Sequence, residues 1–149
     1  MRTALQHIAT LWKIGFVPIA PGTFGTFAAF LFVIIFRPGN RLLLVITIVL
    51  LVVGTVAAHS AEKTLGKKDS GHIIIDEVVG YFVSVLYVDG TMVVYMLAFF
   101  LFRVFDIFKP PPVNYVEKTL SGGLGVMMDD VAAGLYVNVA LQIATSIRF

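Results

Sequence analysis

The sequence contains no cysteine among its 149 residues. This absence excludes disulfide bonds, thiolate metal ligands and a cysteine nucleophile, so any chemistry must use oxygen or nitrogen groups. Charged residues are scarce as well, at 13% of the chain, which is about half the usual share. The basic residues are scattered between apolar segments and the net charge is only +2, a pattern that argues against nucleic acid as a partner.

Several familiar catalytic motifs are also absent. The chain has no Gly-Lys-Ser/Thr phosphate loop, no Gly-x-Ser-x-Gly elbow and no His-Glu-x-x-His helix, so nucleotide-binding, serine-hydrolase and zinc-protease functions lack support. His7, His59 and His72 have no mutual spacing typical of a metal site. Residues 1–8 lack the apolar core of a secretory signal peptide, so we expect membrane insertion to rely on internal segments.

Apolar sequence, by contrast, is abundant. Hydrophobic residues make up 58% of the chain and the mean hydropathy is +0.93, values well above those of ordinary soluble domains. With so little polar surface available, we expect lipid to cover part of the protein. Length and composition together predict a single domain over residues 1–149, an all-α compact membrane bundle of about five helices.

Apolar runs and helix-breaking residues give the expected helix positions. The clearest spanning helix covers 42–58, because this run has no charge and approaches the roughly 20 residues needed to cross hydrocarbon. The amphipathic segment 4–14 predicts an amino-terminal helix at the membrane interface, and a packed surface helix fits its spacing equally well. The other expected helices cover 23–36, two parts of 78–102, and 131–147.

The dipeptide Asp89-Gly90 interrupts the apolar stretch 78–102 and predicts a hairpin between two short helices. This turn would place the amino-terminal region, the 59–76 connection and the 103–130 connection on the same side of the membrane. By the positive-inside rule the side with more basic residues faces the cytoplasm. That side carries eight Lys and Arg residues, against three on the other, which are Arg37, Arg41 and Arg148.

Acidic residues are few but clustered beside apolar segments, at Asp69, Asp76-Glu77, Asp106 and Asp129-Asp130. Carboxylates near hydrocarbon are costly and repel one another unless a cation joins them. Mg²⁺ prefers such oxygen ligands together with phosphate oxygens, so a phosphate-handling magnesium site is one interpretation. The other is that Asp76-Glu77 and Asp129-Asp130 each begin a helix, where acids complement exposed backbone amides.

A second group of polar residues lies in the next apolar segment. Arg103, Asp106 and Lys109 are spaced three residues apart and therefore share one helix face. They could form an intrahelical ladder of ion pairs. Because the surrounding sequence is so apolar, they could instead line a polar cavity.

A third group lies where a helix is expected to begin. Thr23, Gly25 and Thr26 follow Pro21 at the start of the 23–36 segment. The free backbone amides of a helix start can bind an anion, to which hydroxyl groups add hydrogen bonds. Ordinary helix capping explains the same residues, so this motif is weak when taken alone.

Four segments occur in order along the chain: APGTFGT at 20–26, IDEVVG at 75–80, FRVFDIFKP at 102–110 and GGLGVMMDDVAAG at 122–134. Together they resemble the bacterial phosphatidylglycerophosphatase A family, and the resemblance covers residues 15–137. It implies a Mg²⁺-dependent enzyme that converts the lipid phosphatidylglycerophosphate to phosphatidylglycerol and phosphate. It also implies a multi-pass protein of the bacterial cytoplasmic membrane whose active site faces the cytoplasm.

Under this resemblance each candidate residue has an expected role. The expected magnesium ligands are Glu77, Asp106, Asp129 and Asp130. The expected catalytic residues are Asp76, as a base or supporting ligand, and Arg103 and Lys109, which would hold phosphate oxygens. The expected substrate-binding residues are Thr23, Gly25 and Thr26. Direct attack by water and attack by an aspartate nucleophile both remain open.

A different class of function would also place carboxylates among apolar helices. In a small transporter or channel subunit, the acids would line a cation or proton path at different depths. In a phosphatase they would gather at one membrane face. The acids concerned are Asp76, Glu77, Asp106 and Asp130. The sequence does not indicate an oligomeric state.

Overall fold

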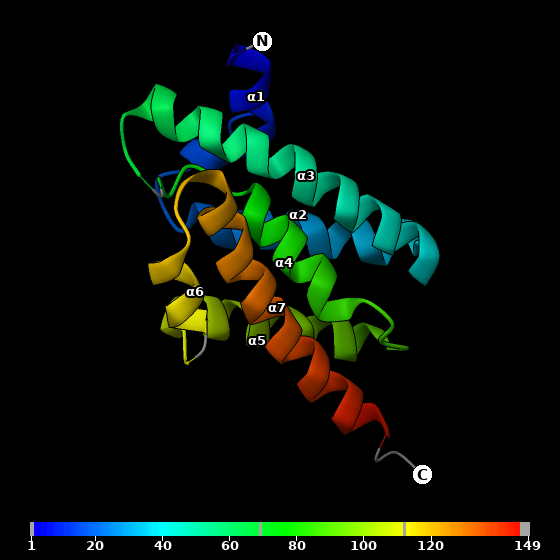
Figure 1. The fold of residues 1–149 in the computed structure, drawn as a ribbon. Helices are drawn as coiled ribbons and strands as arrows, with labels where there is room; N and C mark the ends of the chain where they lie inside the picture. The colour runs from blue at the N-terminus through cyan, green and yellow to red at the C-terminus, as the bar shows by residue number, and fades with distance from the viewer. Residues whose placement is uncertain (1, 69, 112, 147–149) are drawn as a thin grey trace.

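The computed structural model describes residues 2–68, 70–111 and 113–146, so Asp69 and Arg148 lie outside the described residues. Within those ranges the chain is entirely helical, as Figure 1 shows, and the predicted all-α bundle is confirmed. The long helices are α2 (Pro21–Phe36), α3 (Asn40–Leu65), α4 (Ile75–Val85), α5 (Met92–Phe108) and α7 (Gly122–Ser146). The short ones are α1 (Arg2–Ala9), the 3₁₀ turn η1 (Ile14–Phe16) and α6 (Val113–Thr119).

The predicted hairpin at Asp89-Gly90 is present, because α4 ends at Val85 and α5 begins at Met92. Its turn lies at the same end of the bundle as the α2–α3 turn, on the right of Figure 1. The two turns are joined there by a hydrogen bond of 3.1 Å from the Tyr87 backbone amide to Asn40 Oδ1. The beginnings of α4 and α7 and the end of α5 therefore meet at the opposite end.

The amino-terminal helix is shorter than the predicted segment 4–14. It ends at Ala9, and Leu11–Lys13 adopt positive φ angles that turn the chain sharply. The turn brings Gly15 against the backbone of His72, where any Cβ at position 15 would overlap the His72 carbonyl oxygen. This long-range backbone contact is the reason the helix stops, and helical periodicity alone does not reveal it.

Two helices extend beyond their predicted ends. The helix predicted at 42–58 continues to Leu65, and the one predicted at 131–147 begins nine residues earlier, at Gly122. The glycine-rich start of α7 is helical because Gly123 lies directly against α3, where a Cβ would overlap the Thr55 carbonyl oxygen. Asp129 and Asp130 thus lie two turns inside α7. The interpretation that they begin a helix is wrong.

Helix α4 occupies the centre of the bundle, between α2, α3, α5 and α7 (Figure 1). Its closest neighbour is α7, since a Cβ at Gly134 would overlap the carbonyl oxygen of Gly80. The last carbonyl groups of α4 are satisfied from α7, because Asn138 Nδ2 donates to Val83 at 3.0 Å and to Leu86 at 2.7 Å. A short central helix buried on every side therefore keeps its backbone groups paired.

Apolar side chains remain exposed on the outer helices. Both α3 and α7 are long and apolar enough to cross a membrane, whereas α4, at about 16 Å, is too short to do so. One stripe of exposed side chains on α3 comprises Leu42, Val45, Val49, Val52 and Val56. A continuous apolar stripe of this kind fits contact with lipid better than contact with water.

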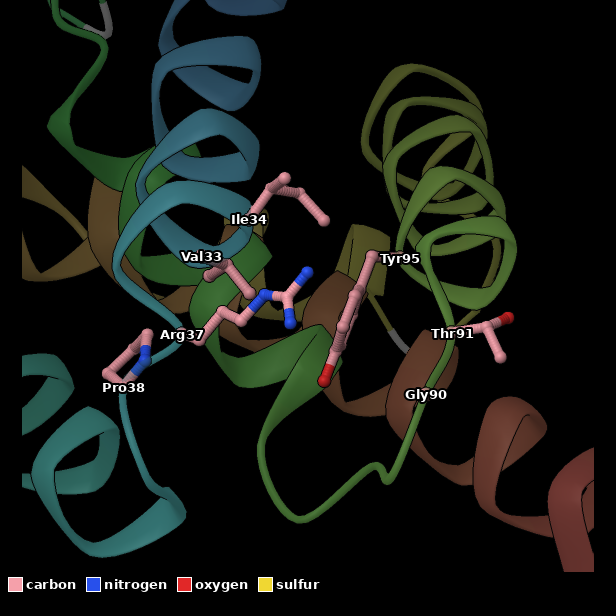
Figure 2. A pocket seen from close by; sticks show the side chains of 7 residues that line it. All are labelled: Val33, Ile34, Arg37, Pro38, Gly90, Thr91 and Tyr95. Atoms are coloured by element: carbon pink, nitrogen blue, oxygen red, sulfur yellow. The ribbon is translucent and has the colours of Figure 1, made fainter.

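A cavity of about 280 Å³ lies at the end of the bundle where the two hairpin turns meet. Figure 2 shows the Arg37 guanidinium pointing into the space between α2 and α5, on the side of Tyr95. No acidic residue lines this cavity in the described part of the chain. The acids predicted to form the site do not lie here.

Enlarging Gly134 tests the α4–α7 contact. We expect Gly134→Ala to lower the free energy of unfolding by about 1–3 kcal/mol, because its methyl group would push against the Gly80 backbone. Gly39→Ala is the control, since nothing lies within 4 Å of a Cβ there. Thermal unfolding in detergent measures both variants. Equal melting temperatures would mean that the two helices are not in such close contact.

Candidate active site

The site begins at the first turn of α4. Asp76 and Glu77 occupy this turn, and no side chain caps the helix at Ile74. The Ile74 amide instead donates to the Ala9 carbonyl oxygen at 2.9 Å, which fixes the start of α4 against the end of α1. Two carboxylates therefore lie at the positive end of a helix dipole, which favours their charged forms.

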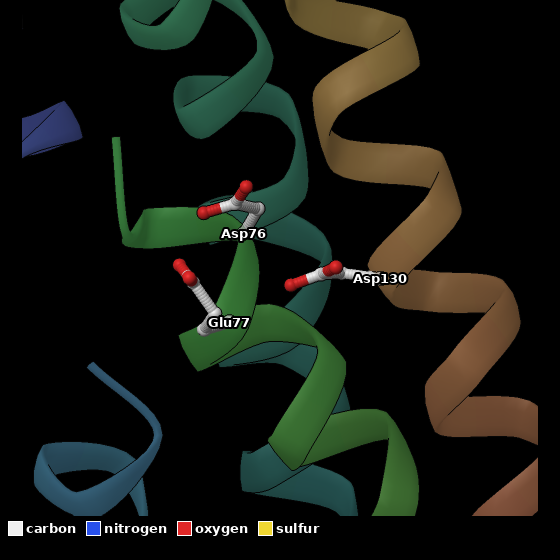
Figure 3. A group of neighbouring side chains, drawn as sticks. All are labelled: Asp76, Glu77 and Asp130. Atoms are coloured by element: carbon white, nitrogen blue, oxygen red, sulfur yellow. The ribbon is translucent and has the colours of Figure 1, made fainter. Parts of the chain in front are cut away.

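A third carboxylate reaches the same point from α7. Oxygen atoms of Asp76, Glu77 and Asp130 lie within 4.8 Å of one another. Figure 3 shows the three side chains converging on the space between the first turn of α4 and the middle of α7. Such a group of oxygen ligands is of the kind that holds Mg²⁺.

The converging oxygens are buried and incompletely paired. Asp76 Oδ1, Glu77 Oε2 and Asp130 Oδ2 are inaccessible to solvent and accept no hydrogen bond from the residues that the structure describes. Asp106 joins the group from α5 through a hydrogen bond between its carboxyl group and that of Asp130. Buried acceptors without a donor are costly, so the oxygens fit a cation that would satisfy them together.

Burial also changes the acidity of the two α4 carboxyl groups. The pKa of Glu77 is raised to about 8, chiefly by burial and also by the neighbouring Asp130 carboxylate, while an Asp76 hydrogen bond and Arg103 oppose the rise. Burial raises the pKa of Asp76 well above its usual range, with the Glu77 carboxylate as the next cause. Without a cation, the cluster therefore retains protons that exposed carboxyl groups would lose.

Arg103 is the cation closest to this cluster. Its Nη1 atom lies 2.8 Å from Asp106 Oδ2 and 3.8 Å from Glu77 Oε1. The same nitrogen donates to Thr26 Oγ1 at 3.4 Å. The Nε atom is buried and has no acceptor among the described residues. Three described side chains thus contact the guanidinium through Nη1, and its Nε–H has no acceptor among the described residues.

Lys109 forms a second charged pair beside the cluster. Its Nζ atom lies 2.7 Å from Asp129 Oδ2, and both side chains are largely buried. Asp129 is also the residue next to Asp130 in α7, and its Oδ1 accepts the Asp130 amide at 3.1 Å. The predicted intrahelical ladder of Arg103, Asp106 and Lys109 is therefore only partly formed, because Lys109 pairs across to α7.

The start of α2 forms another wall. The Thr26 hydroxyl donates to the Gly22 carbonyl oxygen at 3.0 Å and accepts from Arg103, so it connects α2 with α5. Gly25 lies against α4, where a Cβ would be 2.9 Å from the Ile74 carbonyl oxygen. The amide of Thr23 already donates to Ala20 at 3.0 Å, and no described contact joins its side chain to the acids.

Sequence reasoning missed one residue at this wall. A Cβ at Gly22 would overlap Glu77 Oε1 and approach Arg103 Nη2 to 3.1 Å, so only glycine leaves room for the Glu77–Arg103 contact. The only sequence feature that could have indicated Gly22 is its place in the Ala20-Pro21-Gly22 segment. The structure gathers most predicted site residues around this point, namely Thr26, Asp76, Glu77, Arg103, Asp106, Lys109, Asp129 and Asp130.

The sequence matches known lipid phosphatases over most of its length. The profile of the family described as Phosphatidylglycerophosphatase A matches residues 7–145. The Haemophilus influenzae phosphatidylglycerophosphatase A is 33% identical over 140 residues, covering 92% of this chain and 86% of that protein. The Escherichia coli phosphatidylglycerophosphatase A is 32% identical over 124 residues, covering 81% of this chain and 72% of that protein.

A third relative carries a different description. This Bacteroides thetaiotaomicron protein, provisionally described as a phosphatidylinositol-3-phosphatase, is 38% identical over 146 residues. The match covers 92% of this chain and 91% of that protein. No solved structure gives a significant match.

The raised pKa of Glu77 predicts how stability depends on pH when divalent cations are removed. The pKa is about 8 in the folded protein and near 4.5 in the unfolded chain. Between these values the folded protein binds more protons, so the free energy of unfolding falls as the pH rises. We expect the melting temperature in chelator to fall from about pH 5 to about pH 8. Glu77→Gln should flatten this fall, and a melting temperature that rises instead would contradict the burial of the cluster.

Proposed function

Since the chain belongs to the phosphatidylglycerophosphatase A family, we propose that it removes the terminal phosphate of phosphatidylglycerophosphate in a Mg²⁺-dependent reaction. The products are phosphatidylglycerol and inorganic phosphate, so the protein is a lipid phosphatase acting in phospholipid synthesis. The observation that carries the proposal is the convergence of three buried carboxylates from α4 and α7 beside Arg103.

The cation is assigned to Asp76, Glu77 and Asp130, whose unpaired oxygens would hold it. When bound, Mg²⁺ would neutralise phosphate charge and act as a Lewis acid. This assignment differs in part from the ligand set expected from sequence, because Asp76 joins the group and Asp129 pairs with Lys109. Asp106 stays beside the ligands through its hydrogen bond to Asp130.

Arg103 is assigned to the phosphate. Phosphoryl transfer depends mainly on positioning and on stabilising the charge of the phosphate oxygens. Contacts with Asp106 and Thr26 fix the guanidinium, and its buried Nε–H remains as a donor for a phosphate oxygen. Thr26 is therefore assigned as a positioning residue, because it contacts Arg103. This role differs from the one expected from the sequence, in which Thr26 would bind the substrate anion at the start of a helix.

Lys109 is assigned to charge stabilisation at the edge of the site. The reaction breaks the bond between phosphorus and the glycerol oxygen, and the oxygen of a water molecule ends on phosphate. Negative charge grows on the departing glycerol oxygen, where an ammonium group is favourable. Asp129 holds the Lys109 side chain in position. Both direct water attack and a transient aspartyl phosphate are compatible with this arrangement.

The protein is proposed to span the bacterial cytoplasmic membrane several times with its site facing the cytoplasm. The family and the two long apolar helices support a membrane location. The end of the bundle that holds the acids also carries Lys63, Lys67 and Lys68, whereas Arg37 and Arg41 lie at the other end. The positive-inside rule then orients the acids toward the cytoplasm. The lipid phosphate would reach them at headgroup level while its acyl chains stay in the bilayer.

A transporter would use the same acids differently. A conduction path needs ionisable groups at successive depths. The convergence of Asp76, Glu77, Asp106 and Asp130 at one end of the bundle, beside Arg103 and Lys109, favours a phosphate site instead. Failure of the assay below would return the transporter hypothesis to first place.

Phosphate release in detergent micelles tests the proposed reaction. The purified protein should release phosphate from phosphatidylglycerophosphate with Mg²⁺ and not with chelator. We expect Asp130→Asn and Arg103→Ala each to lower kcat by about 100-fold or more, because the first removes a carboxylate that would hold the cation and the second removes the positive charge assigned to the phosphate. Phosphatidylinositol 3-phosphate is the comparison substrate, since the Bacteroides relative is described as acting on that lipid.

Asp89→Asn is the matched control, because it makes the same chemical change in an exposed residue of the α4–α5 turn. It should retain the turnover of the wild type. Absence of release from folded wild-type protein would reject the phosphatase function. Equal losses in Asp89→Asn and Asp130→Asn would reject the assignment of the site.

A further inference from the structure

A second cavity, of about 420 Å³, is lined by residues that lie close in the chain to those of the candidate active site. We call it the headgroup pocket. Its walls come from the loop before α2, the start of α2 and the connection between α3 and α4, and include Phe16, Pro18, Pro21, Lys67, Ser70 and His72. Two short stretches of chain connect it to the acids. Pro21 precedes Gly22, which touches Glu77, and His72 lies four residues before Asp76.

The pocket presents the nitrogen atoms of His72 and Lys67 on an apolar wall. The His72 ring stacks on Phe16, with ring centroids 4.7 Å apart. His72 Nδ1 lies 2.8 Å from the Gly15 carbonyl oxygen. Because a carbonyl oxygen only accepts, Nδ1 carries the hydrogen, and Nε2 of the neutral ring is an acceptor. Lys67 adds an exposed ammonium group, and no described carboxylate is paired with Lys67 or His72.

The loop beside the pocket exposes large apolar side chains. Trp12 is 79% exposed and Ile19 is 76% exposed, with Lys13 between them in the sequence. Exposed aromatic and aliphatic groups next to a lysine are typical of segments that lie at the lipid headgroup boundary. The headgroup pocket therefore lies beside a segment suited to the headgroup boundary.

We propose that the headgroup pocket binds the phosphodiester of the lipid substrate, with the Lys67 ammonium group as its donor. The inference rests on the proposed function. Phosphatidylglycerophosphate carries a phosphodiester, which stays in the product, and a terminal phosphate one glycerol unit away, which is removed. When the terminal phosphate lies at Arg103, the phosphodiester must lie at a neighbouring site. The headgroup pocket is lined by residues close in the chain to the acids and supplies positive charge and apolar walls.

This division of labour has a consequence for selectivity. Arg103 and the carboxylate cluster would act on any accessible phosphate monoester. Lys67 would select esters that carry a second phosphate linked to a lipid. Losing the Lys67 ammonium should therefore weaken substrate binding more than it slows the chemical step.

Kinetics in mixed micelles test this inference with Lys67→Ala. We expect KM for phosphatidylglycerophosphate to rise by about tenfold, the usual effect of losing one charge-assisted hydrogen bond, while kcat changes much less. Lys67→Arg should restore most of the affinity. Lys68→Ala is the matched control, because Lys68 is an exposed lysine next in the chain that does not line the pocket. Its KM should stay at the wild-type value.

Binding of phosphatidylglycerol separates this inference from the proposed reaction. This lipid has the phosphodiester and lacks the terminal phosphate, so its affinity can be measured without turnover. We expect Lys67→Ala to weaken its binding by a similar factor and to leave inhibition by inorganic phosphate unchanged. Equal behaviour of Lys67→Ala and Lys68→Ala in KM and in lipid binding would overturn the inference. Absence of turnover in the wild type would overturn only the proposed function if lipid binding still depended on Lys67.

Discussion

The carboxylates of α4 and α7 face one another only because the two helix backbones are almost in contact. Gly80 and Gly134 leave no side chain between the helices at their crossing. The same closeness brings Asp130 within reach of Asp76 and Glu77, about one turn toward the amino end of each helix. Helix packing in an apolar chain thus sets the geometry of the polar site, since small residues permit approach that larger ones would prevent.

The site contains more carboxylates than basic side chains, and this excess of acidic groups explains why some of them are unpaired. Five carboxylates lie around two basic side chains, Arg103 and Lys109. Burial makes each unpaired carboxylate costly, so the folded chain without a cation must retain protons. Under the proposed function, binding of a divalent cation together with a phosphate would relieve this cost. The same buried carboxylates that lower the stability of the fold would hold the cation in the proposed reaction.

Sequence patterns predicted the parts of this arrangement that depend on local chemistry. The Asp89-Gly90 turn and the clustering of acids could be read directly, because a polar turn and a buried charge are both conspicuous in apolar sequence. The start of α7 could not be predicted from the sequence. Glycines weaken an isolated helix, but here the contact between α7 and α3 requires a glycine at position 123. The sharp turn at Leu11–Lys13 and the space that Gly22 leaves for Glu77 also depend on partners far away in the chain.

The order of the site residues along the chain bears on how the protein is made. Asp76 and Glu77 are synthesised before Asp130, which arrives only with α7. Until α7 has inserted beside α4, the nascent protein holds an acidic pair without its third member. The carboxylate cluster therefore assembles only after α7 has been synthesised and has packed beside α4.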